Sequence, residues 1–141
     1  MISQNEIKYL KSLNLKKYRL KYKQIIVEGL RLVSESLNSN NKYNVLEIYI
    51  TSDLISKPEL QILIENAKNK FVKIIEISNK ILRQITHTKN PQGVCAKVKI
   101  EYMDSKKFKN NIKGNIIFLD GIQDPGNLGT LLRTAAWFGI N

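Results

Sequence analysis

The chain has 141 residues, of which 43% are hydrophobic and 25% charged, a composition typical of one ordinary globular domain. No apolar run approaches the roughly 18 residues of a membrane-spanning helix, and Met1–Glu6 lacks the regions of a signal peptide, so we expect a cytoplasmic protein. A net charge of +11 indicates a polyanionic partner, although most of the basic residues are lysines that could simply solvate the surface.

The first segment is predicted to be a short helix. Ser3 and Glu6 have the spacing of a capping box, and the residues expected to be buried behind it are Ile7, Leu10 and Leu13. The stretch 16–23 then places cations between two tyrosines. Lysine and arginine neutralise phosphates and tyrosine rings can stack on unpaired bases, so this stretch is a candidate RNA contact. The alternative interpretation is a solvated linker.

Strands and helices are predicted to alternate from residue 24 to residue 100. We expect strands at 24–27, 45–51, 71–77 and 94–100, and helices beginning near residues 30, 58 and 78. This alternation predicts a mostly parallel sheet with helices packed on it. The single cysteine, Cys95, is expected to be a small core residue, and the single histidine, His87, a loop residue rather than a metal ligand. No metal site is expected.

The C-terminal segment predicts a strand, a tight turn and a helix. Residues 116–119 form an apolar run that is typical of a buried strand. Pro125 can preset φ in a turn and Gly126 can adopt the positive φ that follows it. Asn127 is expected to be the N-cap of a helix from about Leu128 to Phe138.

One face of this last helix is apolar. The stripe that should face a core contains Leu128, Leu131, Leu132, Ala135 and Phe138. Arg133 lies off the stripe, and its side chain should lean toward the helix N-terminus over Gly129, where no side chain obstructs it. The alternative for Arg133 is an ordinary solvated charge. Trp137 lies opposite the stripe, where we expect either an additional partner surface or partial cover by its helix neighbours.

The segment Leu119–Ala136 closely resembles the first motif of the SpoU (TrmH-like) RNA 2'-O-ribose methyltransferases. Glu28-Gly29 after a basic stretch and a strand, and Pro91-Gln92-Gly93 before a strand, resemble the substrate-binding domain of the same family. The resemblance implies an α/β fold, with a small α/β/α sandwich that binds RNA at residues 1–100 and a linker at 101–115. Residues 116–141 would be the first strand, turn and helix of an incomplete SPOUT (trefoil-knot) methyltransferase domain.

The resemblance also implies an activity and a set of site residues. The intact protein would transfer a methyl group from S-adenosyl-L-methionine to a ribose 2'-hydroxyl of rRNA or tRNA, and would be a homodimer. Arg133 and Asn127 would be catalytic, in a turn made by the residues Asp124, Pro125, Gly126 and Gly129. The expected RNA contacts are Lys17, Arg19, Lys21, Lys23, Glu28, Gly29, Arg31 and Gln92. The residues that bind the cofactor are expected beyond Asn141.

Two other classes of function stay open at this point. The later motifs of the family are absent from the 141 residues, so we expect an N-terminal portion that is inactive alone and does not bind the cofactor. Such a portion could be an RNA-binding module without catalysis. A structural or interaction protein that uses an exposed apolar tail is the third possibility. The sequence does not identify the RNA or the nucleotide.

Overall fold

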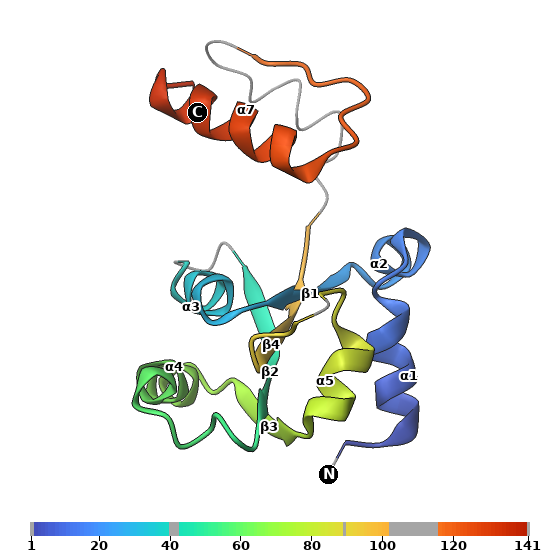
Figure 1. Cartoon of the computed structure of the whole chain (residues 1–141), viewed down its shortest axis with the longest axis vertical. Helices are drawn as coiled ribbons and strands as arrows, with labels where there is room; N and C mark the ends of the chain where they lie inside the picture. The colour runs from blue at the N-terminus through green and yellow to red at the C-terminus, as the bar shows by residue number, and fades with distance from the viewer. Residues whose placement is uncertain (1, 40–42, 89, 102–115, 141) are drawn as a thin grey trace. The chain divides into compact units, whose positions relative to one another are not determined.

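The computed structural model describes residues 2–39, 43–88, 90–101 and 116–140. The chain divides into two compact units, Met1–Tyr102 and Met103–Asn141, which are described separately below (Figure 1). The predicted linker at 101–115 lies outside the described residues except for Glu101. No helix in the described ranges is long and apolar enough to cross a membrane.

A four-stranded sheet forms the centre of the first unit. Its strands are β1 (Gln24–Glu28), β2 (Asn44–Thr51), β3 (Lys73–Ile77) and β4 (Val94–Lys99), in the order β1-β4-β2-β3. The pair β2–β3 is parallel, whereas β4 runs antiparallel to both β1 and β2. The prediction of a mostly parallel sheet is therefore wrong, although each predicted strand of this unit is present.

Hydrogen bonds at the start of β4 show its direction. The backbone amide of Gly29, just after β1, donates to the carbonyl of Val94 at 3.0 Å, and that of Thr51, at the end of β2, donates to Gly93 at 2.9 Å. Thus β4 begins where β1 and β2 end. Helix α5 (Asn79–Ile85) and the loop after it connect β3 to β4. Strand β4 therefore starts at the end of the sheet where β1 and β2 finish, and it runs antiparallel to both.

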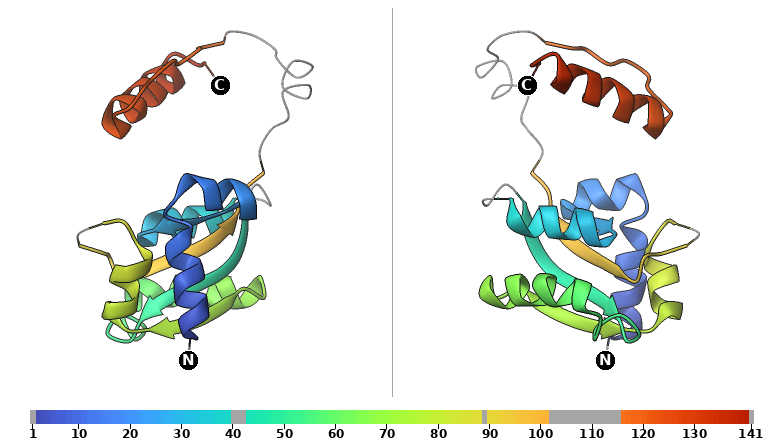
Figure 2. Two further views of the ribbon diagram at one scale, coloured as in Figure 1. Left: turned by 90° about the vertical axis from the view of Figure 1, so that its right-hand side faces the viewer. Right: turned by 60° about the vertical axis from the view of Figure 1, so that its left-hand side comes forward.

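Helices cover both faces of the sheet, which confirms the predicted sandwich. Helices α3 (Leu30–Asn38) and α4 (Pro58–Asn69) pack on one face, and α1 (Gln4–Ser12) and α5 pack on the other (Figures 1 and 2). Successive side chains of a strand point to opposite faces. Accordingly, Ile48 and Ile50 belong to the core under α3 and α4, while Tyr49 and Cys95 belong to the core under α1 and α5.

The predicted helix starts of this unit are confirmed at two serines. The Ser3 hydroxyl accepts from the amide of Glu6 at 3.1 Å, and the Ser78 hydroxyl accepts from the amide of Ile81 at 3.3 Å. These bonds satisfy amide groups that a helix leaves without partners in its first turn. The basic stretch is also helical: α2 (Lys16–Tyr22) is a short helix that buries none of its residues.

The second unit contains the helix α7, which spans Pro125–Trp137. Its N-cap is Asp124, whose carboxylate accepts from the Asn127 amide at 2.7 Å, so the prediction that Asn127 is the cap is wrong. Proline suits the first helical position because its φ is already helical and its missing amide hydrogen is not needed there. The helix therefore starts three residues earlier than predicted, and the positive φ of the preceding turn occurs at Gly121 (65°) instead of Gly126.

Residues 116–119 are not a strand in this structure. Ile116, Ile117 and Phe118 are exposed, and the described residues of the second unit contain no strand. A strand needs a neighbour for its backbone hydrogen bonds, and a lone extended segment has none. The apolar stripe of α7 is likewise not packed in a core, because none of the residues of the helix is buried. Within the described residues, the second unit has no core of its own.

Candidate nucleic-acid interface

Two segments that are distant in the sequence, the end of β1 and the loop before β4, meet at one end of the sheet. The Thr88 hydroxyl donates to the carboxylate of Glu28, 60 residues earlier in the chain. The Gln92 side chain lies over Gly29, so that its Oε1 would be 2.7 Å from a Cβ atom added at that glycine. The structure therefore brings together Glu28, Gly29 and Gln92, all three of which were predicted as RNA contacts. We call the cluster of Glu28, Gly29, Thr88 and Gln92 the loop edge.

Gly29 gives the loop edge its particular chemistry. Its φ of 94° is in the region that favours glycine, and it is the N-cap of α3 without a side chain to cap the helix. The amide groups of the first helical turn are therefore left to other acceptors, and the Gln92 side-chain amide is exposed beside them. Helix amides and a glutamine amide are donors suited to phosphate oxygens and to the edges of bases.

A second set of hydrogen bonds joins this region to α2. The Arg19 guanidinium donates to the carbonyls of Leu13 and Asn14, at 3.2 and 2.7 Å. The His87 Nε2 atom lies 3.2 Å from the same carbonyl of Asn14. Arg19 and His87 thus connect the corner between α1 and α2 to the loop that contains Thr88 and Gln92. One nitrogen of the Arg19 guanidinium, Nη1, makes both of its bonds to backbone carbonyls.

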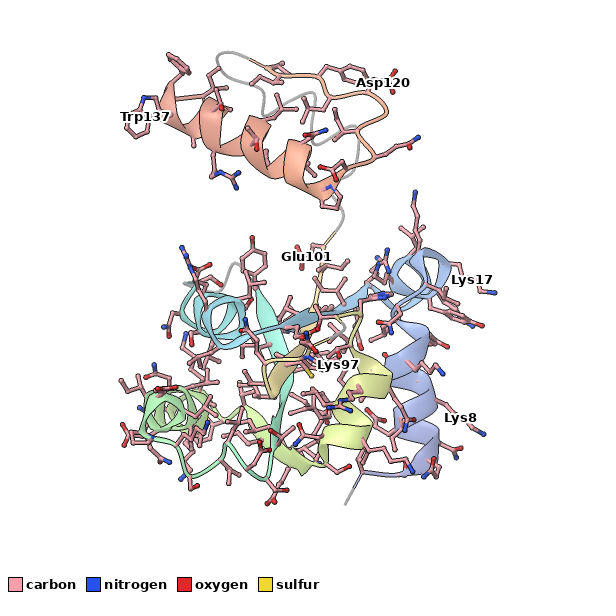
Figure 3. The ribbon with its side chains drawn as sticks, in the orientation of Figure 1. Lys8, Lys17, Lys97, Glu101, Asp120 and Trp137 are labelled. Carbon is pink, nitrogen blue, oxygen red and sulfur yellow. The ribbon has the colours of Figure 1, made fainter. Side chains whose placement is uncertain are left out.

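The predicted lysine contacts lie on or beside α2 with exposed side chains. Lys17 and Lys21 are on the helix, and Lys17 projects outward from it (Figure 3). Lys23 is the C-cap with a left-handed φ of 52°, and its carbonyl accepts from Ile100. Arg31, in the first turn of α3, pairs with Glu35 at 2.9 Å, but its side chain is 90% exposed. An exposed pair of this kind contributes little and can exchange for a phosphate.

Sequence reasoning missed His87, Thr88 and Tyr9 as parts of this region. The contact of His87 with Asn14 spans 73 positions, so no local pattern indicates it. Tyr9 packs edge-on against Tyr22 with ring centroids 5.0 Å apart. The sequence around Tyr9 does not indicate this contact, because a tyrosine two residues after Ile7 is also typical of an ordinary helix face.

In the second unit, Arg133 lies as expected over Gly129. A Cβ atom at Gly129 would be 3.2 Å from Nη1 of Arg133, and Nη2 donates to the Thr130 hydroxyl at 3.2 Å. That hydroxyl in turn donates to the carbonyl of Gly126 at 3.0 Å. The guanidinium is therefore held along the first turns of α7. It presents a fixed positive charge and free N–H donors, the groups that stabilise a developing negative charge on oxygen.

The described residues offer no obvious place for a metal ion. Within them, no group of three or more His, Cys, Asp or Glu side chains lies close enough together to hold one. The thiol of the buried Cys95 is expected to be unreactive, since burial raises its pKa to about 12. Both surfaces offer hydrogen-bond donors and positive charge.

The chain is similar to known proteins along most of its length. The family described as the MRM3-like substrate binding domain matches residues 4–96. The chain is 29% identical over 136 residues to the 23S rRNA (guanosine(2553)-2'-O)-methyltransferase RlmP of Bacillus subtilis. This match covers 96% of the chain and 49% of RlmP. The chain thus spans about half the length of this curated relative.

Solved structures extend the similarity to the fold. A protein of Porphyromonas gingivalis assigned to the TrmH family of RNA methyltransferases matches with a TM-score of 0.64 at 30% identity, over all of this chain and 51% of its own. The SpoU methyltransferase AviRb of Streptomyces viridochromogenes, solved with AdoMet, matches with a TM-score of 0.72 at 18% identity. That match covers 94% of this chain and 49% of AviRb, and it supports the fold alone. The chain belongs to the SpoU (TrmH-like) family of RNA methyltransferases, and residues 4–96 match its MRM3-like substrate-binding domain.

Proposed function

We propose that residues 1–100 bind RNA through the loop edge and α2, and that the intact protein methylates a ribose 2'-hydroxyl of rRNA or tRNA. The observation that supports RNA binding best is the meeting of Glu28, Gly29 and Gln92, which the sequence separates by some 60 positions, beside a helix of exposed lysines. In this proposal residues 101–115 are a linker and 116–141 begin the catalytic domain. A homodimer in the cytoplasm remains our expectation for the intact protein.

Phosphate contacts can be tested through the salt dependence of binding. Each phosphate neutralised on a single strand contributes roughly 0.7 to the slope of log affinity against log salt. Replacing Lys21 and Lys23 with glutamine should flatten that slope by about one to two. The matched control replaces Lys68 on α4 and Lys73 on β3, exposed lysines at the opposite edge of the sheet from β1, and should leave the slope unchanged. An unchanged slope in the first variant would contradict the proposed contacts.

For catalysis, we propose that Arg133 orients the ribose hydroxyl and stabilises the alkoxide that develops on it. A guanidinium does not lose its proton in proteins, so Arg133 is not an ordinary general base. Asn127 lies within the first turn of α7 and would hydrogen-bond the ribose or a phosphate there. S-adenosylmethionine would supply the methyl group, but the described residues do not fit a site for it, since α7 buries none of its side chains.

A single-turnover assay on a full-length protein tests this role. Arg133→Ala should reduce the rate of methyl transfer by about 100-fold or more, the usual effect of removing a group that stabilises a developing oxyanion. The RNA affinity should change little, because the proposed contacts with RNA lie in the first unit. A variant that kept most of the rate would show that Arg133 has another role.

The second candidate, an RNA-binding module without catalysis, describes the 141-residue chain by itself. The absence of any buried residue in α7 favours it for this portion. Labelled S-adenosylmethionine distinguishes the two candidates: the chain of 141 residues should retain RNA but not the labelled cofactor. Retention of the cofactor by this chain would contradict the assignment of its site to residues beyond Asn141.

A further inference from the structure

Helix α2 presents two tyrosine rings that are already arranged in parallel. Tyr18 and Tyr22 are four residues apart and therefore lie on the same face of the helix. Their ring centroids are 6.1 Å apart and their planes differ by only 8°. The helix buries none of its residues, and Tyr22 is 36% exposed. The rings therefore form a surface of the first unit that solvent can reach.

This pair is fixed from one side by α1. Tyr9 packs edge-on against Tyr22, with a centroid distance of 5.0 Å and an angle of 70° between the planes. The hydroxyl of Tyr9 donates to Gln24 at the start of β1, which holds that ring in turn. A planar ligand would thus meet rings whose orientation is set before binding, so little side-chain entropy would be lost.

Cations flank both rings. The Lys17 ammonium lies 4.9 Å from the centroid of Tyr18, and the Lys21 ammonium lies 5.3 Å from the centroid of Tyr22. An exposed cation–π contact is weak compared with a stacked base. A base can therefore displace these ammonium groups from the rings, and the flexible lysine stems allow them to reach the phosphates on either side of that base.

Packing of α2 onto α1 is the ordinary explanation for such a cluster, and it accounts for the Tyr9–Tyr22 contact. It does not account for the rest of the helix surface. Leu15, one turn before Tyr18, is 54% exposed, and Leu20, on the opposite face of the helix, is 46% exposed. The segment therefore keeps apolar area in water instead of covering it. Exposed apolar area next to lysines matches a ligand with flat apolar faces and a negative backbone.

We propose that the Tyr18–Tyr22 face of α2 stacks on unpaired bases of RNA, with Lys17 and Lys21 on the adjacent phosphates. This inference rests on the proposed function and specifies the form of its substrate. Bases within an A-form duplex are stacked on one another and hide their faces, so the bound segment must be a loop, a bulge or a single strand. The bonds of Arg19 and His87 to Asn14 place α2 next to the loop edge, so the same RNA would contact both.

The test compares single-stranded and duplex RNA by fluorescence anisotropy on the 141-residue chain. A labelled 12-nucleotide strand is titrated alone and annealed to its complement. Tyr18→Leu and Tyr22→Leu should each weaken binding of the single strand by about 5- to 150-fold, the range expected for one stacked base. Tyr18→Phe retains the ring and should bind within about twofold of the unsubstituted chain. Binding of the duplex should be unaffected by any of these changes.

Two controls separate stacking from folding and from charge. Tyr43→Leu removes a tyrosine that is 48% exposed just before β2, and it should not alter affinity. Replacing Lys17 and Lys21 with glutamine should flatten the salt slope, whereas the tyrosine variants should leave the slope unchanged. Photocrosslinking with 5-iodouracil in the single strand should attach RNA to the peptide that contains α2.

The possible outcomes distinguish this inference from the proposed function. Single-strand affinity that is unchanged in both leucine variants overturns the stacking site, while RNA binding itself stands. A loss of affinity that accompanies a lower melting temperature, with no crosslink to α2 in the unsubstituted chain, also overturns it. If no RNA binds to the chain at all, the proposed function and this inference both fail.

Discussion

The ammonium of Lys97 lies 2.7 Å from a carboxylate oxygen of Glu47, on the face of the sheet that α1 and α5 cover. The same ammonium is 3.2 Å from Glu6, and the buried Tyr49 hydroxyl donates to Glu47. Burial by itself would raise the pKa of Glu47, but the hydrogen bonds from Lys97 and Tyr49 outweigh it and hold that pKa below its ordinary value. Burial would lower the pKa of Lys97, whereas its hydrogen bonds to Glu47 and Glu6 raise it.

Replacing Glu47 with glutamine should lower the free energy of unfolding by about 2 kcal/mol at neutral pH, between the values typical of exposed and buried pairs. Because the pKa of Glu47 is lowered by folding, its contribution is present above the unfolded pKa and is lost as the pH falls through the folded pKa. Urea unfolding at neutral pH and at a series of lower pH values measures this, and the difference between the two proteins should shrink as the pH falls. Glu6→Gln is the control and should cost less, since that pair is longer and more exposed.

Gly29→Ala should destabilise the first unit by about 1–2 kcal/mol, because its φ of 94° is strained for a residue with a Cβ atom. The added atom would also meet Gln92, but that side chain is exposed and can move aside. Combining Gly29→Ala with Gln92→Ala should therefore restore little of the stability. A double variant as stable as Gln92→Ala alone would mean that the cost comes from the clash and not from the backbone. Thermal and urea unfolding provide the measurement.

The thiol of Cys95 should not react with a disulfide reagent in the folded chain. The side chain is 0% exposed, and burial raises the pKa of the thiol to about 12, so very little thiolate exists near pH 8. The reaction should proceed at the rate of unfolding and become fast in urea. Since the chain has one cysteine, the released chromophore reports on this residue alone. Rapid reaction without denaturant would contradict the assigned burial.

Trp137 should give red-shifted fluorescence that acrylamide quenches almost as well as it quenches the urea-unfolded chain. It is the only tryptophan and its side chain is 87% exposed on α7, pointing away from the helix (Figure 3). We also expect the 141-residue chain to self-associate through the exposed apolar residues of this helix, which sedimentation can detect. A stable monomer with blue-shifted, protected emission would show that the helix is buried in solution.

Local sequence patterns were sufficient for most elements of the first unit. The capping serines Ser3 and Ser78 each accept the helix amide that their position predicts, because a cap is a contact across three residues. The alternation of strand and helix correctly indicated a layered α/β unit. The position of the Arg133 side chain over Gly129 was also predicted from residues of the same helix, and the structure confirms it.

The tertiary structure decided what depends on partners that are distant in the sequence. The antiparallel direction of β4 is set by its pairing with β1 and β2, and no pattern within the strand encodes this direction. The apolar run 116–119 reads as a strand, yet a strand forms only where another strand accepts its hydrogen bonds. The loop edge, in which Glu28 meets Thr88, and the pairing of Lys97 with Glu47 likewise exist only after the sheet has assembled. The sequence alone thus identified the family and its local elements, whereas the assembly of the sheet placed the candidate contacts side by side.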